Sequence, residues 1–137
     1  MNSCLDIVAI GDAIVDVIAT CDDSFLAERG FLKGSMRLLT PDEARNLYAA
    51  MGPGREVSGG SAANSMAGAA ALGLNAGFVG QVADDQLGAI FAHDMRSLGV
   101  RFETAPIPGP PPTGRCLILV TPDAQRTITP RQGQVMN

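Results

Sequence analysis

The chain has 137 residues, of which 46% are hydrophobic and 18% are charged, a composition typical of one globular domain and not of a disordered chain. Only 4% of the residues are aromatic and there is no Trp, whereas Ala and Gly are abundant and allow close packing of helices and strands. The formal net charge is −4 and no cluster of Lys or Arg occurs, which argues against a nucleic-acid groove and against binding to an anionic membrane surface.

The three cysteines, Cys4, Cys21 and Cys116, show neither a CxxC nor a Cys/His spacing. This pattern argues against a disulfide framework and against structural zinc, so we interpret each cysteine as a small apolar filler. The N-terminus lacks a basic segment before its apolar run, and no apolar stretch reaches membrane-spanning length. We therefore expect a cytoplasmic protein without a membrane or nucleic-acid partner.

Two strands separated by a glycine are the first predicted elements. Residues 5–10 form a short apolar run typical of a buried strand, and Gly11 follows it. From Asp12 to Thr20 the side chains alternate in character, so we expect Asp12 and Asp16 on the same face of a strand. Two carboxylates on one strand face indicate a polar site beside a sheet.

The clearest helix start lies at residues 40–43. Thr40 is predicted as the N-cap, Pro41 occupies the first helical position, and Glu43 completes a capping box. Gly52 is expected to end this helix. The other expected elements are, in chain order, a helix at 23–29, a strand at 34–39, extended residues at 56–58, a helix at 61–72, a strand at 76–82, a helix after Asp84 or Asp85, and strands at 100–103, 115–121 and 125–129. The alternation of strands and helices predicts a parallel α/β sheet.

A glycine turn at the start of the helix predicted over residues 61–72 is the strongest candidate binding segment. Gly59 and Gly60 allow a ligand to approach the backbone, and the helix start offers unpaired N–H groups. Asn64 adds a side chain that both donates and accepts hydrogen bonds. Such a turn suits a polyhydroxyl ligand, although a Gly-Gly pair before a helix also occurs as ordinary turn chemistry. It matches neither the GxxxxGK nor the GxGxxG pattern of nucleotide-binding loops.

Two further side chains, Asp16 and His93, are candidates outside this turn. A carboxylate at Asp16 can accept hydrogen bonds from two neighbouring hydroxyls, and a solvated strand residue is the alternative interpretation. His93 is the single histidine and lies within a predicted helix, where we interpret it as structural or exposed. A serine triad therefore has no support.

Several segments, in one order, resemble motifs of the ribokinase-like (PfkB) carbohydrate and nucleoside kinase family. The similar segments are IGDAIVD (10–16), SGGSAAN (58–64), Gly73, FVG (78–80), ADDQLG (83–88), PTG (112–114) and DAQRT (123–127). The resemblance covers about residues 5–128 and is nearest to bacterial adenosine-kinase-like members.

This resemblance implies a Rossmann-like α/β core with a small β lid drawn from about residues 16–39 and 100–129. Family members transfer the γ-phosphate of ATP to a sugar hydroxyl with a divalent cation such as Mg²⁺. By position, Arg126 would approach the transferring phosphate, with an exposed hairpin-turn residue as the equal alternative. The resemblance also implies a set of residues that bind a sugar or nucleoside: Asp12, Asp16, Gly59, Gly60, Ser61 and Asn64.

The sequence departs from the family pattern in three ways. Asp12 replaces an amide that the family often has with a group that only accepts hydrogen bonds when ionised, which could change substrate choice. Met66 and Ala83 also differ, but neither removes a proposed ligand contact. The largest departure is the absence of the family's late Asp-Thr-x-Gly-Ala-Gly-Asp segment, which holds the catalytic Asp; residues 130–137 do not resemble the family's continuation.

We therefore expect residues 1–137 to be the N-terminal, substrate-binding part of such a kinase, without a catalytic residue and without most of the ATP and Mg²⁺ site. Such a fragment would not phosphorylate adenosine or ribose by itself. Two alternatives stay open. One is a non-catalytic binding module that associates through exposed lid or sheet-edge strands, including as a homodimer; the other is a gene remnant that folds poorly.

Overall fold

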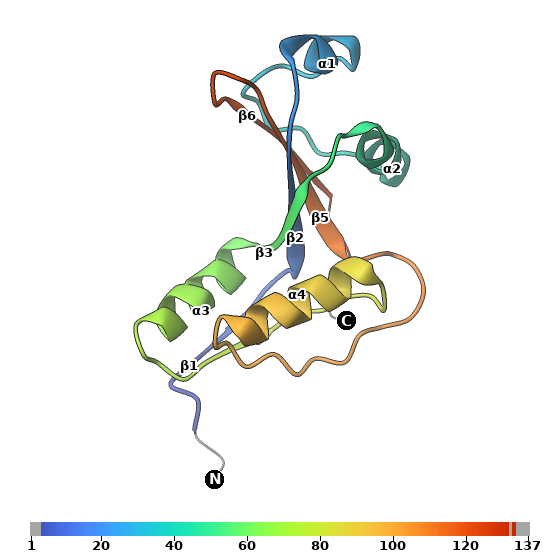
Figure 1. Ribbon diagram of the computed structural model, residues 1–137. Helices are drawn as coiled ribbons and strands as arrows, with labels where there is room; N and C mark the ends of the chain where they lie inside the picture. The colour runs from blue at the N-terminus through green and yellow to red at the C-terminus, as the bar shows by residue number, and fades with distance from the viewer. Residues whose placement is uncertain (1–3, 132, 134–137) are drawn as a thin grey trace. The chain divides into compact units, whose positions relative to one another are not determined.

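A computed structural model describes residues 4–131 and 133 of the chain, which form a mixed α/β structure (Figure 1). The elements are, in chain order, β1 (Ile7–Ile10), β2 (Ile14–Thr20), α1 (Asp23–Glu28), α2 (Pro41–Ala50), β3 (Arg55–Gly59), α3 (Ser61–Ala71), β4 (Ala76–Val79), α4 (Gln86–Ser97), β5 (Gly114–Val120) and β6 (Arg126–Arg131). They build a two-stranded sheet, β1-β4, and a four-stranded sheet of order β3-β2-β5-β6. In the described part of the chain, no helix is both long and apolar enough to cross a membrane.

The chain divides into two compact units. Among the described residues, unit 1 contains 4–15, 57–114 and 133, and unit 2 contains 16–56 and 115–131. These bounds differ from the two lid segments implied by the resemblance, because α2 belongs to unit 2 and residues 100–114 belong to unit 1. Whether unit 2 acts as a lid stays a prediction.

Unit 1 is organised around a parallel strand pair. β1 and β4 pair in register from Ile7 opposite Ala76 to Ile10 opposite Val79, which confirms the expected parallel pairing. The expectation that β1 is buried was wrong, because most of its side chains are exposed. The strand expected at residues 100–103 forms only a bridge between Arg101 and Gly77. Its partner β4 ends at Val79 and not at residue 82 as expected.

Three aromatic rings form the centre of the core of unit 1. Phe78, Phe91 and Phe102 are at most 2% exposed, and their ring centroids lie 5.3–6.1 Å apart. Tilted and edge-to-face rings at these separations add about 0.5–1.5 kcal/mol per pair to the stabilisation from burial. Because Phe91 belongs to α4 and Phe78 to β4, this cluster fixes the helix to the strand.

The start of α4 shows why the ADDQLG segment needs its particular residues. Asp85 is the N-cap, and one of its carboxylate oxygens accepts hydrogen bonds from Gly88 N–H at 2.8 Å and from the Thr113 hydroxyl at 2.7 Å. The other oxygen accepts from Thr113 N–H at 2.9 Å. A Cβ on Gly88 would lie 2.2 Å from the Ala83 carbonyl oxygen, so no larger residue fits there without a shift of backbone.

The predicted start of α2 in unit 2 is confirmed in detail. The Thr40 side chain accepts a hydrogen bond from Glu43 N–H at 3.3 Å, and Glu43 Oε2 accepts one from Thr40 N–H at 2.9 Å. These reciprocal bonds satisfy two N–H groups that a helix start otherwise leaves open. They also lower the pKa of Glu43, with the Thr40 backbone bond as the first cause.

Side chains of the sheet in unit 2 alternate between its two faces. β5 and β6 are antiparallel, with Ile118 opposite Ile128, and these two residues are half-buried. The side chains of Leu117, Leu119 and Thr129 point to the opposite face of the sheet and are fully buried. The half-buried side of this sheet is called the open face below.

Residues 34–39 were expected to form a strand, and the structure contains only part of one. Met36 bridges to Ile128 in parallel, and Arg37 N–H donates to the Ile128 carbonyl at 3.0 Å. Leu39 N–H also donates to the Pro130 carbonyl at 3.3 Å, and the segment ends at Thr40, the N-cap of α2. Met36 and Leu38 are 69% and 73% exposed, and Met36 shares the open face with its partner Ile128.

Candidate functional site

The glycine turn lies between β3 and α3, where the sequence places it. Gly59 ends β3, and Gly60 is the N-cap of α3 with φ of 91°. A Cβ on Gly60 would lie 3.0 Å from the Asp12 carbonyl oxygen. Both the positive φ and this close approach require glycine at residue 60. No side chain caps α3, so the turn leaves the first N–H groups of the helix available to a ligand.

The polar residues of the turn lie at its surface. Ser61 and Asn64 are exposed on the first turn of α3, and Asn64 N–H donates to the Gly60 carbonyl at 2.9 Å in the first helical hydrogen bond. The hydroxyl of one residue and the amide of the other thus stand beside the unpaired N–H groups of the helix start. This combination of donors and acceptors can bind a ligand that carries several hydroxyls.

Asp12 lies beside the glycine turn in unit 1 but not in the conformation expected. β2 begins at Ile14, so Asp12 lies in the connection between β1 and β2. Strand alternation therefore does not place its side chain on one face with Asp16, and that expectation was wrong. A Cβ added at neighbouring Gly11 would lie 2.9 Å from the Ala62 Cβ, so the connection passes directly against the first turn of α3.

Asp16 belongs to unit 2, where it lies half-buried on β2. Burial raises the pKa of its carboxyl above the usual range. No described residue within hydrogen-bonding distance donates to this carboxylate or pairs with it as an ion. A half-buried carboxylate without a partner is a group that a ligand with hydroxyls can satisfy.

Cys116 is the titratable neighbour of Asp16 in unit 2. Burial, followed by the negative charge of Asp16, raises the pKa of the Cys116 thiol to about 11. The thiol is therefore neutral at pH 7, in agreement with its interpretation as a small apolar filler. That interpretation does not hold for Cys4, which is exposed, and Cys21 is half-buried. A neutral thiol carries no positive charge, so Cys116 does not compensate the negative charge of Asp16.

Arg126 is the first residue of β6 and is exposed. It lies opposite Val120 at the end of the β5–β6 ladder, directly after the turn of residues 121–125. In that turn the Thr121 hydroxyl donates to Asp123 Oδ1 at 2.6 Å, and Ala124 has φ of 64°. The guanidinium group is thus attached to a turn that hydrogen bonds hold in one conformation.

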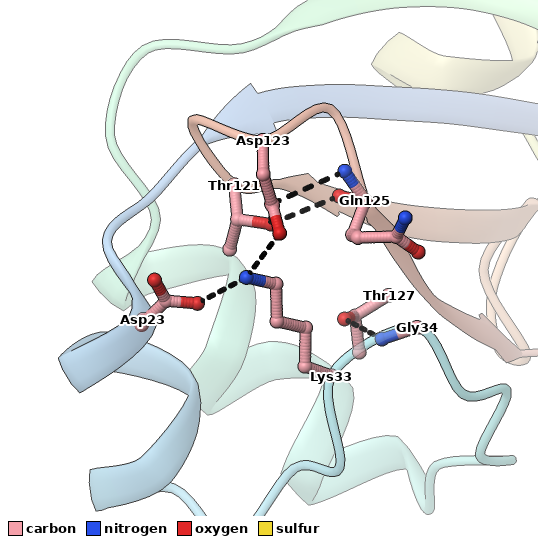
Figure 2. Close-up of polar contacts among 7 residues, drawn as sticks. All are labelled: Asp23, Lys33, Gly34, Thr121, Asp123, Gln125 and Thr127. Atoms are coloured by element: carbon pink, nitrogen blue, oxygen red, sulfur yellow. Dashed lines mark hydrogen bonds and ion pairs between the residues drawn. The ribbon is translucent and has the colours of Figure 1, made fainter.

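A lysine between two aspartates ties this turn to α1, as Figure 2 shows. Lys33 Nζ lies 2.7 Å from Asp23 Oδ1 and 2.6 Å from Asp123 Oδ2. The hydrogen bond from Lys33 is the first cause that lowers the pKa of Asp123 to about 2. Gly34 N–H also donates to the Thr127 hydroxyl at 3.1 Å. The sequence contains no local signal for this cluster, because its members come from distant segments.

Two further properties complete the site. Among residues 4–131 and 133, no group of three His, Cys, Asp or Glu side chains could hold a metal ion. Asp12 shares unit 1 with Gly59, Gly60, Ser61 and Asn64, whereas Asp16 and Arg126 belong to unit 2. His93 is exposed, with 82% of its side chain accessible, in agreement with its interpretation from the sequence.

Comparisons with known proteins show which proteins share these features. The adenosine kinase of Sinorhizobium meliloti superposes with a TM-score of 0.84 at 53% identity, over 96% of this chain and 40% of that one. A probable sugar kinase of Rhizobium etli CFN 42 superposes with a TM-score of 0.84 at 45% identity, over 96% of this chain and 40% of that one. An ATP-dependent ribose-1-phosphate kinase of Halopiger xanaduensis is 35% identical over 79 residues, which are 58% of this chain and 27% of that protein.

The chain spans about 40% of the length of these solved structures, so the described site corresponds to a part of each of them. The fold agrees with the ribokinase-like architecture implied by the sequence motifs. The model of the pfkB family of carbohydrate kinases matches residues 5–137. This chain therefore belongs to the pfkB carbohydrate kinase family.

Proposed function

We propose that this chain binds the phosphate acceptor of an ATP-dependent sugar or nucleoside kinase. The observation that carries the proposal is Asp16, a half-buried carboxylate whose pKa is raised by burial and which no described residue satisfies. Two adjacent hydroxyls of a ribose ring can each donate to one of its oxygens. The family supports this class of acceptor, as do the similar adenosine kinase and ribose-1-phosphate kinase.

The open face around Asp16 supports a ligand with an apolar part. Ile18 lies two residues further along β2, and Ile118 and Ile128 occupy the half-buried side of β5 and β6. A carboxylate with apolar neighbours is typical of small-molecule sites, in which a few polar groups fix the orientation of a ligand. A nucleoside combines hydroxyls with an apolar base, and a free sugar has only the hydroxyls.

The glycine turn and Arg126 have separate roles in this proposal. In unit 1, the turn with Asp12, Ser61 and Asn64 offers N–H and side-chain groups that suit the oxygens of a sugar or nucleoside. Arg126 approaches the phosphate that is transferred, where a guanidinium group stabilises the developing negative charge. Its exposed position on a held turn supports this role.

Only membership of the family implies ATP and Mg²⁺. The described residues offer no cluster of three metal-binding side chains, so they do not fit a metal site by themselves. Apart from the phosphate contact proposed for Arg126, we assign no step of phosphoryl transfer to these residues. Their contribution is to bind and orient the acceptor hydroxyl, which accelerates transfer through positioning.

A titration tests the proposal directly. Adenosine and ribose are added to the 137-residue chain, and binding is measured by calorimetry and by amide chemical shifts. Saturable binding is expected, and Asp16→Asn weakens it about tenfold or more, because a charged acceptor is lost. Asp42→Asn is the matched control, because the Asp42 side chain is 82% exposed and its ion pair among the described residues is with Arg45. Equal affinities for Asp16→Asn and the unchanged chain would refute the proposal.

A second candidate function is self-association. Met36 and Leu38 are 69% and 73% exposed, and Met36 lies at the edge of the open face. Exposed apolar residues beside a sheet favour pairing with another chain. Light scattering of the ligand-free chain distinguishes this candidate. A concentration-dependent dimer that dissociates when Met36→Ser and Leu38→Ser are combined supports it, and a monomer at all concentrations excludes it.

A further inference from the structure

A carboxylate from α4 holds the backbone that leads into the glycine turn. Ser58 N–H donates to Asp94 Oδ2 at 2.8 Å. These residues are 36 positions apart in the chain and both belong to unit 1. β3 is an edge strand of its sheet, and edge strands leave backbone N–H groups without a neighbouring strand. Asp94 therefore supplies the acceptor that the sheet does not.

The helix presents Asp94 from a rigid position. Phe91 and Met95, on the same helix, are at most 1% exposed, and Phe91 belongs to the aromatic core of unit 1. The Asp94 side chain itself is 27% exposed, so its carboxylate is partly withdrawn from water. A hydrogen bond from a neutral N–H to an ionised acceptor is stronger than one between neutral groups.

The neighbouring histidine does not replace this contact. His93 Nδ1 lies 3.6 Å from Asp94 Oδ1, the oxygen that Ser58 does not use, and its side chain is 82% exposed. His93 therefore takes no part in the contact between Asp94 and Ser58. This arrangement provides a control residue one position away on the same helix.

The residues that follow Ser58 depend on its orientation. Gly59 and Gly60 come next, and Gly60 has φ of 91° against the Asp12 carbonyl. Two consecutive glycines have more backbone freedom than other residues, so a fixed residue before them restricts the conformations that the turn samples. A binding group that is already held in its bound conformation loses less entropy when a ligand arrives.

We propose that Asp94 is a positioning residue, which holds Ser58 and thereby orders the Gly59–Gly60 turn for the acceptor. The proposal rests on the proposed function for its consequence in binding, although the contact itself does not. Asp94 touches no ligand in this scheme. It acts through Ser58, from the α4 helix and the aromatic core behind it.

The test uses the 137-residue chain with three substitutions. Asp94→Ala removes the acceptor, Asp94→Asn keeps an oxygen that can accept from Ser58, and His93→Gln is the matched control. For Asp94→Ala we expect amide hydrogen exchange at Ser58 to become about tenfold faster or more, shifted Gly59 and Gly60 amide resonances, and about tenfold weaker binding of adenosine or ribose. In Asp94→Asn we expect the exchange at Ser58, the Gly59 and Gly60 resonances and the ligand affinity to stay close to those of the unchanged chain. In His93→Gln we expect all three to equal those of the unchanged chain.

The outcomes separate this inference from the proposed function. Unchanged exchange at Ser58 in Asp94→Ala would overturn the contact, and changed exchange with unchanged affinity would overturn the positioning role. If the unchanged chain binds neither ligand, the proposed function fails, and the Gly59 and Gly60 resonances decide whether Asp94 orders the turn. If Asp94→Ala does not fold, Asp94→Glu keeps the charge one methylene away and is expected to give intermediate exchange at Ser58; exchange equal to that of the unchanged chain would contradict the proposal.

Discussion

The two units expose different kinds of groups to a ligand. In unit 1 the candidate site consists mainly of backbone: two glycines, the start of α3 and the Asp12 carbonyl beside Gly60. In unit 2 it consists of side chains on strands, with Asp16 on the open face and Arg126 at the end of a ladder. Substitutions at the candidate site in unit 1, such as Gly60→Ala, therefore act through strain, and those at the candidate site in unit 2, such as Asp16→Asn, act through lost charge.

The strands of the two units explain this difference. β4 in unit 1 has buried residues at Ala76, Gly77 and Phe78 in succession, as expected for a parallel strand, while its partner β1 exposes Ile7, Val8 and Ile10 by 39%, 50% and 70%. β5 in unit 2 alternates, so one of its faces can carry a site. A strand buried along its length leaves only its ends and loops for binding.

The largest effect is expected in the core of unit 1. Phe91→Ala removes a ring that is 0% exposed and contacts two others, so the free energy of unfolding should fall by about 3–5 kcal/mol. Urea unfolding monitored by circular dichroism measures this loss. Leu72→Ala serves as the control because Leu72 is 86% exposed. A loss below about 1 kcal/mol for Phe91→Ala would contradict a packed aromatic core.

The next effect compares two glycines with positive φ. Gly60→Ala combines φ of 91° with a contact of 3.0 Å to the Asp12 carbonyl, and should destabilise the chain by about 1–3 kcal/mol. Gly30→Ala has φ of 68° and open space around its Cβ, so strain alone, about 1 kcal/mol, is expected. Urea unfolding and ligand titration together check the pair. Equal losses of stability would show that the Asp12 contact contributes nothing.

A smaller effect, of opposite sign, is expected at Asp16. Burial raises its pKa in the folded state, so the folded chain binds the proton more tightly than the unfolded chain. The contribution of Asp16 to the free energy of unfolding is therefore greatest below the unfolded pKa of 3.8 and falls as the pH rises through the folded pKa. Asp16→Asn should unfold at a higher urea concentration than the unchanged chain at pH 7, while it binds ligand more weakly. A lower midpoint at pH 7 would show that Asp16 has a stabilising partner.

The smallest effect is expected at Lys33, whose ion pairs are at the surface of unit 2. Lys33→Met removes both pairs, and exposed pairs stabilise little, so the Tm should fall by less than for either substitution in unit 1. The Asp123 pKa is lowered from 3.8 to about 2, so its contribution is present above pH 3.8 and is lost as the pH falls toward 2. Melting curves at pH 7 and pH 2 check this. A difference between the two chains that is larger at pH 2 would contradict the assigned pair.

Local signals predicted several elements correctly. The capping box of Thr40 and Glu43 lies within four residues, and the end of α3 and the Gly60 turn follow from neighbouring glycines. The alternation after Ile14 predicted β2 and placed Asp16 on a partly exposed strand. The strand expected at 34–39 appeared only as a bridge between Met36 and Ile128, because pairing depends on a distant strand that the local sequence does not specify.

The sequence by itself determined the identities and order of the proposed binding groups: a glycine turn before a small-residue helix, and a carboxylate in an alternating strand. These depend on conformational preferences and spacings of nearby residues. The tertiary structure decided which groups have partners. It placed Asp94 on Ser58 and Lys33 on Asp123, put Asp12 outside β2, and left Asp16 half-buried without a donor. Contacts between distant segments arise from packing of the whole unit, and no local pattern encodes them.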